Sequence, residues 1–211
     1  MILIDAASKM RAHAHILSIH DHSLVVLAGA PESATSHEPH LTLVQSLAKG
    51  DKVDNIVRDA TELGVSTLVV ASTKRCVVQL DSERATQRMD RWRKIAEEAT
   101  RQCERDDVPE LLGIVSWDEA MQSVAQESAR FVLYERAETP LGEPLANALI
   151  HDRPLAFAVG PEGGLDPDEV ACALENGWAI TSMSPTILRT ETVATAVLGA
   201  VAVWRGGMQS A

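Results

Sequence analysis

A glycine-rich segment stands where an apolar run meets the start of a helix. Gly160–Gly164 (GPEGG) directly follows the apolar run Pro154–Val159 and precedes a helix-start signal at Asp166. In open parallel sheets, ligands bind outside the carboxyl ends of the strands, and glycines let the backbone approach a ligand closely. The segment lacks both the GxGxxG spacing and the lysine of a phosphate-binding loop, so neither a dinucleotide fold nor a P-loop is indicated. The alternative is a plain tight turn.

A second polar segment precedes the last apolar helix. Ser184–Thr192 (SPTILRTET) places Arg189 immediately before that helix, where a cation opposes the helix dipole, whereas Glu191 suits it. Such an adverse placement is tolerated where a site uses it. The alternative is a surface ion pair between Arg189 and Glu191, which contributes little to stability. Together with Phe131–Arg136 (FVLYER), these segments predict three strand-end loops that converge on one edge of one sheet and form a ligand site.

The elements that must position these loops alternate between strands and helices from residue 41 onward. The hydrophobic patterns predict strands at 41–47, 66–71, 131–134, 154–159 and 178–183. Start and stop signals predict helices at 51–63, 81–103, 142–150, 166–177 and 190–204, and a capping box at Ser116–Glu119 opens one more. This alternation is typical of an α/β domain with a mainly parallel sheet.

The first 40 residues form a different kind of segment. Residues 1–30 predict strands with a hairpin that turns at His20–His22, and residues 30–40, which contain two prolines, predict a linker. We therefore place a domain boundary between residues 1–40 and 41–211. A β segment of this size is too small to fold well alone. It packs on the rest, pairs with another chain, or belongs to a domain whose beginning is absent.

Composition limits the classes of protein. The 211-residue chain is 45% hydrophobic and 23% charged, which excludes wholesale disorder, and no uncharged apolar run reaches the roughly 18 residues of a membrane span. Its three cysteines are odd in number and far apart, which favours a reducing, cytoplasmic setting. The histidine pairs near the N-terminus have no further ligand at suitable spacing, so we expect no metal site.

The charge is distributed unevenly. A net charge of −11 argues against nucleic-acid binding for the chain as a whole. However, 12 of the 19 Lys and Arg residues lie within 41–110, where they can form a local positive surface. The predicted helix 190–204 is apolar on nearly every face after its first turn, so it is buried in the domain or against a partner. We favour a dimer interface for it.

The motifs described above carry a resemblance to a known family. GPEGGLDPDEV at residues 160–170, followed by ILRTET at 187–192, resembles the RsmE family, the 16S ribosomal RNA uracil-N3 methyltransferases of the SPOUT class. The resemblance extends back through KGDKVD and ATELGV and covers about residues 41–205. It implies an α/β SPOUT domain with a C-terminal trefoil knot, which is an exception to the rule of unknotted chains, preceded by part of a PUA-like β-barrel. It also implies S-adenosylmethionine as the cofactor, the small ribosomal subunit and its 16S rRNA as the partner, and a homodimer packed through the knot helix.

The resemblance assigns the cofactor to the three predicted loops. The implied cofactor-binding residues are Leu133, Tyr134, Glu135, Val159, Gly160, Pro161, Glu162, Gly163, Gly164, Met183, Ser184, Pro185, Ile187, Leu188, Arg189, Thr190 and Thr192. Methyl transfer to uridine N3 requires loss of the imide proton, so negative charge develops on N3 and its flanking carbonyls, and a fixed cation stabilises that charge. We predict this catalytic role for Arg189. Glu191 and Glu135 are candidates for the general base.

The middle third of the chain carries the cations implied for RNA binding. Arg84, Arg88 and Arg91 recur at helical spacing. The full predicted set is Arg75, Arg84, Arg88, Arg91, Lys94, Arg101 and Arg105. The alternative is a solvated helix face balanced by its own acidic residues.

Several features depart from the family pattern, among them Glu104, Met183-Ser184 and Thr186. Only about 40 residues precede the predicted methyltransferase domain, fewer than a complete barrel contains, and Asp106 and Asp107 add negative charge where the family leads us to expect neutral or basic residues. Two other functions stay open. One is a SPOUT enzyme that methylates a ribose 2′-oxygen, and the other is an inactive RNA-binding or assembly protein.

Overall fold

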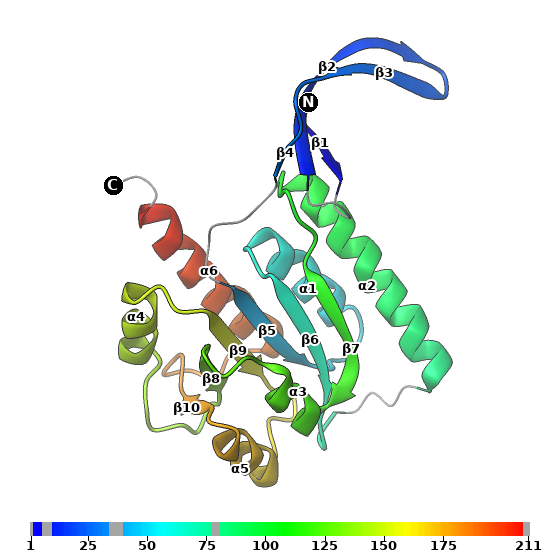
Figure 1. Ribbon diagram of the computed structural model, residues 1–211. Coiled ribbons are helices and arrows are strands. Elements are labelled where there is room, and N and C mark those ends of the chain that lie inside the picture. Colours follow the sequence, from blue (N-terminus) through cyan, green and yellow to red (C-terminus); the bar gives the residue numbers. More distant parts are fainter. Residues whose placement is uncertain (1, 6–9, 34–39, 77–80, 209–211) are drawn as a thin grey trace.

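The computed structural model describes residues 2–5, 10–33, 40–76 and 81–208. Most of these residues surround one six-stranded sheet (Figure 1). Its strands are β5 (Leu41–Ser46), β6 (Thr67–Ser72), β7 (Glu110–Ser116), β8 (Ala129–Leu133), β9 (Leu155–Val159) and β10 (Ala179–Thr181). They lie in the order β10-β8-β9-β5-β6-β7, and every neighbouring pair is parallel. The predicted α/β class with a mainly parallel sheet is therefore confirmed.

Helices cover both faces of the sheet. They are α1 (Lys52–Glu62), α2 (Ser82–Gln102), α3 (Trp117–Ser123), α4 (Gly142–Ile150), α5 (Pro167–Glu175) and α6 (Thr190–Met208). On one face, α1, α2, α4 and α6 enclose a core that contains Trp92 and Phe157. On the other face, α3 and α5 pack with Trp117 and Trp178. Strands β5 and β9 are buried along their whole length, and β9 is accordingly apolar throughout, whereas β5 also buries Thr42, Gln45 and Ser46.

Helices α3 and α5 begin at the predicted positions because each has a capping box. Ser116 accepts a hydrogen bond from the Glu119 amide, and the Glu119 carboxylate accepts one from the Ser116 amide. Asp166 and Glu169 make the reciprocal pair at α5, where Pro167 occupies the first helical position. These caps satisfy amides that a helix start leaves without intrahelical partners. They fix the ends of the loops that enter the two helices.

The structure differs from the sequence prediction in several elements. Residues 32–33 of the predicted linker form the short strand β4, because they pair with β2, and β8 begins at Ala129 rather than at residue 131. Strand β7 was not predicted, because Gly113 interrupts its apolar run at the place where the register with β6 shifts. Strand β10 is shorter than the predicted 178–183, because Ser182 pairs with Thr139 and Pro140 instead. Helix α6 continues to Met208 rather than ending at Trp204.

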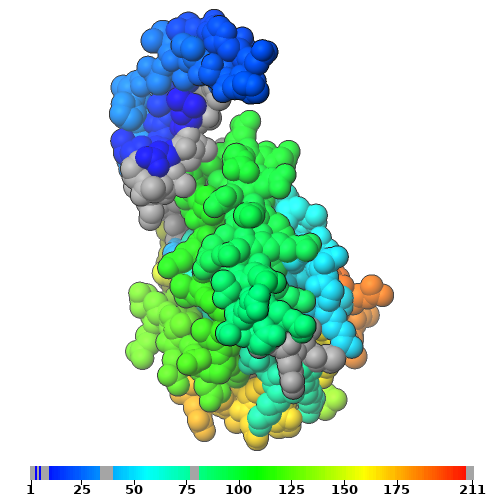
Figure 2. All heavy atoms as spheres, turned by 90° about the vertical axis from the view of Figure 1, so that its right-hand side faces the viewer, coloured from blue at the N-terminus to red at the C-terminus, as the bar shows by residue number. Residues whose placement is uncertain are grey.

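The N-terminal strands form a separate antiparallel sheet. It contains β1 (Ile2–Asp5), β2 (Met10–His20), β3 (Ser23–Ala28) and β4 (Glu32–Ser33). The predicted hairpin is confirmed as β2–β3, and it projects away from the six-stranded sheet (Figures 1 and 2). Large apolar side chains on it are exposed, among them Leu17 at 62% and Ile19 at 74%. Part of the predicted linker, residues 34–39, lies outside the described residues.

Ion pairs explain the two aspartates that depart from the family pattern. The Arg11 guanidinium on β2 lies 2.6 Å from an oxygen of Asp106, in the segment between α2 and β7. Asp107 pairs with Arg105 at 3.1 Å. Each added negative charge therefore meets a cation of the same chain.

Among the described helices, none is both long enough and apolar enough to cross a membrane.

Candidate functional site

A cavity of about 420 Å³ opens at the carboxyl edge of the sheet. The loops after β8, β9 and β10 and the first turn of α6 enclose it. Its lining residues are Leu133, Tyr134, Glu135, Val159, Gly160, Pro161, Glu162, Gly163, Gly164, Leu165, Met183, Ser184, Thr186, Ile187, Leu188, Arg189, Thr190 and Val193. Strands β8, β9 and β10 lie on one side of the sheet, so the cavity lies outside the carboxyl ends of strands, where open α/β sheets bind ligands.

The structure therefore brings the three predicted strand-end loops together. Of the residues predicted for the cofactor, only Pro185 and Thr192 lie outside the cavity lining. Leu165, Thr186 and Val193 line it although the sequence analysis did not select them. Val193 was identifiable in principle, because it lies one helical turn after Thr190. Leu165 and Thr186 carried no separate signal.

The turn Gly160–Gly164 requires its glycines. Gly164 adopts φ +71°, a left-handed conformation that other residues rarely adopt. A Cβ atom on Gly163 would lie 3.1 Å from the Arg75 Cβ and 3.2 Å from the Arg75 carbonyl oxygen. The Gly164 amide donates to the Pro161 carbonyl at 2.9 Å and closes the turn. The turn is thus pressed against the loop after β6, and its bare backbone lines the cavity.

Glu162 anchors this turn to the start of α1. Its carboxylate accepts a hydrogen bond from the Lys49 amide at 3.1 Å and lies 3.0 Å from the Lys52 ammonium nitrogen. Partial burial favours the protonated form of Glu162, but the hydrogen bonds from Lys52 and from backbone amides outweigh it and lower the pKa of the carboxyl group. The hydrogen bond to Glu162 raises the pKa of Lys52 in turn. Both groups are therefore charged near neutral pH.

A buried polar chain joins the same turn to the start of α6. The Thr190 hydroxyl donates to the Gly160 carbonyl at 2.8 Å and accepts from the Gln45 amide group at 2.9 Å. Gln45 is fully buried at the end of β5. Three segments that meet at the cavity are thus fixed to one another.

Arg189 lines the cavity from the residue before α6. Its side chain is exposed and forms no ion pair among the described residues. The alternative of an Arg189–Glu191 ion pair is wrong, because Glu191 lies against Lys52 at 3.4 Å. Glu135 lines the cavity as well, with the Arg136 guanidinium 3.9 Å from its carboxylate. The cavity therefore presents one uncompensated cation and two carboxylates among apolar walls.

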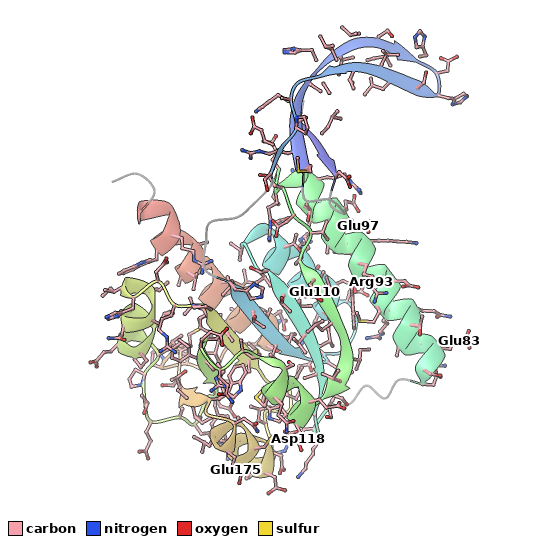
Figure 3. All side chains as sticks on the ribbon, in the orientation of Figure 1. Glu83, Arg93, Glu97, Glu110, Asp118 and Glu175 are labelled. Carbon is pink, nitrogen blue, oxygen red and sulfur yellow. The ribbon has the colours of Figure 1, made fainter. Side chains whose placement is uncertain are left out.

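The residues predicted to bind RNA divide into three groups. Arg88, Lys94 and Arg101 on α2 make no ion pair within the described part of the chain. Arg84 pairs with Asp81 and Arg91 with Asp54. The Arg105 side chain is only 16% exposed. Figure 3 shows Glu83, Arg93 and Glu97 pointing outward from α2, so this surface carries both signs of charge.

Arg75 and Arg105 have defined partners. Arg75 lies against the glycine turn, and its guanidinium contacts Asp166 at 3.2 Å. Arg105 donates to the carbonyls of Thr61 and Val65 at 2.6 and 3.0 Å and to Asp107. Its guanidinium thus closes the end of α1, and the structure gives it an internal role rather than a surface one.

A parallel sheet with helices on both faces and a cavity at the carboxyl ends of its strands places this domain in the class of ligand-binding α/β domains. Within that class, the chain belongs to the family described as RNA methyltransferase domain, which matches residues 36–202.

Curated relatives extend this finding. The chain is 34% identical over 169 residues to the ribosomal RNA small subunit methyltransferase E of Mycobacterium tuberculosis, with 78% of this chain and 63% of that protein covered. It is 32% identical over 163 residues to the protein of the same name from Bacillus subtilis, covering 75% and 64%. The chain thus spans slightly less than two thirds of the length of these relatives.

A solved structure is similar over nearly the whole chain. It is a ribosomal RNA small subunit methyltransferase E from Neisseria gonorrhoeae bound to S-adenosyl methionine, with a TM-score of 0.82 and 28% identity, covering 96% of this chain and 82% of that one. The SpoU methyltransferase AviRb from Streptomyces viridochromogenes shares the fold at a TM-score of 0.50 and 16% identity.

Proposed function

We propose that the chain binds S-adenosylmethionine in the cavity and methylates N3 of a uridine in the 16S rRNA of the small ribosomal subunit. One observation carries the proposal. The glycine turn Gly160–Gly164 and the loop that carries Arg189 are separate segments of the chain, and they enclose a single cavity whose size suits a small-molecule ligand. The names of the similar proteins supply the substrate class.

The lining suits this cofactor. Leu133, Val159 and Leu165 offer buried apolar surface for an adenine ring, and the glycine turn offers backbone donors and acceptors. The Glu162 carboxylate in the lining complements a ligand that carries a sulfonium and an ammonium group. When bound, the cofactor supplies an electrophilic methyl group.

Arg189 is the group we assign to stabilise the reacting base. Loss of the N3 proton places negative charge on N3 and the flanking carbonyl oxygens of the uracil. Arg189 is exposed at the cavity and free of an ion pair among the described residues, so its charge is available there. The target base must be unstacked or single-stranded to enter the cavity.

Glu135 is the better of the two candidates for the general base. Glu191 pairs with the Lys52 ammonium group at 3.4 Å and does not line the cavity. Glu135 lines the cavity, and the Arg136 guanidinium lies 3.9 Å from its carboxylate, farther than Lys52 lies from Glu191. We therefore assign proton acceptance to Glu135.

RNA is held, in this proposal, by cations of α2 and by Arg75 beside the cavity. Arg88, Lys94 and Arg101 are the members without a competing acidic partner in the described chain, so they supply most of the phosphate attraction. Arg84 and Arg91 contribute by exchanging an acidic partner for a phosphate. Arg105 is left out because its guanidinium is used internally.

We further propose a trefoil knot and a homodimer. Ser182 pairs with the segment Thr139–Leu141, and the chain then passes to α6, whose first residue bonds to Gly160. These contacts support a threaded C-terminus. One side of α6 exposes Ala196, Ala200, Val203 and Trp204, and this apolar stripe supports packing against a second copy.

The N-terminal sheet is proposed as part of a PUA-like barrel. Its strands are antiparallel and expose apolar side chains as an incomplete barrel does. The site of action is proposed as the cytoplasm, where small subunits are assembled in bacteria.

The function is tested with purified protein, labelled S-adenosylmethionine and small subunits that lack the modification. The expected product on nucleoside analysis by mass spectrometry is 3-methyluridine. A 2′-O-methylated nucleoside would replace the N3 assignment with the ribose alternative. Absence of any labelled nucleoside, with cofactor binding intact, would favour the inactive RNA-binding alternative.

A further inference from the structure

Lys52 lies between the two loops that build the cavity. Its ammonium nitrogen is 3.0 Å from Oε1 of Glu162 in the glycine turn and 3.4 Å from Oε2 of Glu191 in the first turn of α6. All three side chains are about 30% exposed, so the contacts are only partly screened by water. Lys52 itself does not line the cavity.

Glu191 depends on this lysine for charge compensation. Its Oε2 atom is buried and makes no hydrogen bond among the described residues. A carboxylate oxygen in that position is unfavourable unless a cation lies near it. The Lys52 ammonium group is the cation that the structure brings to it.

The position of Glu191 also determines that of Arg189. Glu191 belongs to the first turn of α6, and the Arg189 carbonyl accepts a hydrogen bond from the Val193 amide of the same turn. If the Glu191 side chain holds the first turn of α6 in place, it also holds the backbone that carries Arg189. Glu162 has the corresponding place in the glycine turn, held by Lys52 and by the Lys49 amide.

We propose that Lys52 is a positioning residue that couples the glycine turn to the Arg189 turn through Glu162 and Glu191. The expected effects on cofactor affinity and on kcat rest on the proposed function, but the coupling of the two turns is a property of the free protein. Without the ammonium group, two carboxylates of neighbouring loops lose their common cation and the loops separate.

The test compares Lys52→Met with Lys52→Arg and with the control Arg58→Met. Arg58 lies on the same helix, and its ion pair is with Asp59 outside the cavity, so the control removes the same charge from the same element. Hydrogen–deuterium exchange is followed in residues 160–165 and 187–194 of the cofactor-free protein. Calorimetry then measures S-adenosylmethionine binding, and the nucleoside assay measures kcat.

We expect Lys52→Met to speed exchange in both segments, to weaken cofactor binding about tenfold, as for loss of a charged hydrogen bond, and to lower kcat. Lys52→Arg is expected to keep the exchange rates, the cofactor affinity and kcat near their wild-type values at an unchanged melting temperature. Arg58→Met is expected to leave all three quantities at the wild-type level. If Lys52→Met is too unstable to measure, Glu191→Gln, which keeps the lysine, should still speed exchange in 187–194 and lower kcat.

Two results separate the possible failures. If the exchange rates and cofactor affinity of Lys52→Met equal those of Arg58→Met, the coupling by Lys52 is refuted. If wild-type protein does not bind the cofactor, the proposed function fails, while the exchange data on the free protein still decide the role of Lys52.

Discussion

The Thr190 hydroxyl donates to the Gly160 carbonyl at 2.8 Å, which ties the end of β9 to the start of α6 across 30 residues of sequence. Because Gln45 donates to the same hydroxyl from the end of β5, three segments meet at one buried oxygen. Loss of the Thr190 hydroxyl would therefore remove both hydrogen bonds that join these segments beside the cavity.

Replacement of Thr190 by Val is expected to destabilise the protein by about 1–3 kcal/mol, because the Gly160 carbonyl and the Gln45 amide both lose a partner in a buried place. Chemical denaturation measures the free energy of unfolding. Thr192→Val is the matched control, because Thr192 lies in the same turn of α6 and is exposed. Equal stabilities of the two variants would show that the polar chain does not hold the site.

Arg189→Ala is expected to lower the rate of methyl transfer by roughly 10²–10³-fold, the usual effect of removing one group that stabilises developing negative charge. Single-turnover kinetics with saturating cofactor isolate this step. Arg189→Lys keeps the charge and should retain part of the rate. Wild-type rates in Arg189→Ala would remove this residue from the mechanism.

If the cations of α2 bind RNA, two double variants that each remove two positive charges should differ in RNA affinity. Lys94→Gln with Arg101→Gln removes cations that have no ion pair in the described chain, whereas Arg58→Gln with Arg153→Gln removes cations bonded to Asp59 and to the Glu127 carbonyl. Only the first pair should weaken RNA binding and reduce its salt dependence, by roughly 0.7–0.9 in logarithmic slope for each lost phosphate contact. Identical salt slopes would place the RNA elsewhere.

The pH dependence of stability should carry the signature of Glu162. Its pKa is lowered in the folded protein, so it adds stability above its unfolded pKa of about 4.3, and that stability is lost as the pH falls through the folded pKa. The stability difference between wild type and Glu162→Gln is therefore expected to be constant from pH 6 to 8 and to shrink below about pH 4. Denaturation curves at a series of pH values measure this. A difference that grows on acidification would contradict the assigned direction.

Local signals in the sequence predicted most of the fold. The capping residues Ser116 and Asp166 marked helix starts correctly, because a cap depends on residues within one turn. Strand β7 was not predicted, because Gly113 interrupts its apolar pattern and because the strand is placed by pairing with β6. Short-range patterns do not contain that information.

The site was predicted in its loops but not in its connections. Gly160–Gly164 and Arg189 were selected from residue type and position, and the structure places both at one cavity. The contacts of Lys52 with Glu162 and of Gln45 with Thr190 join residues more than 100 positions apart, so no local pattern indicates them. Arg105 shows the converse, because a cation in a basic region turned out to bond to backbone carbonyls of α1.

The most direct test is a calorimetric titration of S-adenosylmethionine into the wild-type protein and into Gly163→Ala. The account predicts saturable binding at one site per chain, and weaker binding in the variant, whose Cβ atom would lie 3.1 Å from the Arg75 Cβ and displace the turn. Gly142→Ala is the control, because a Cβ atom there meets nothing within 4 Å. Absence of binding to the wild type at millimolar cofactor would contradict the account.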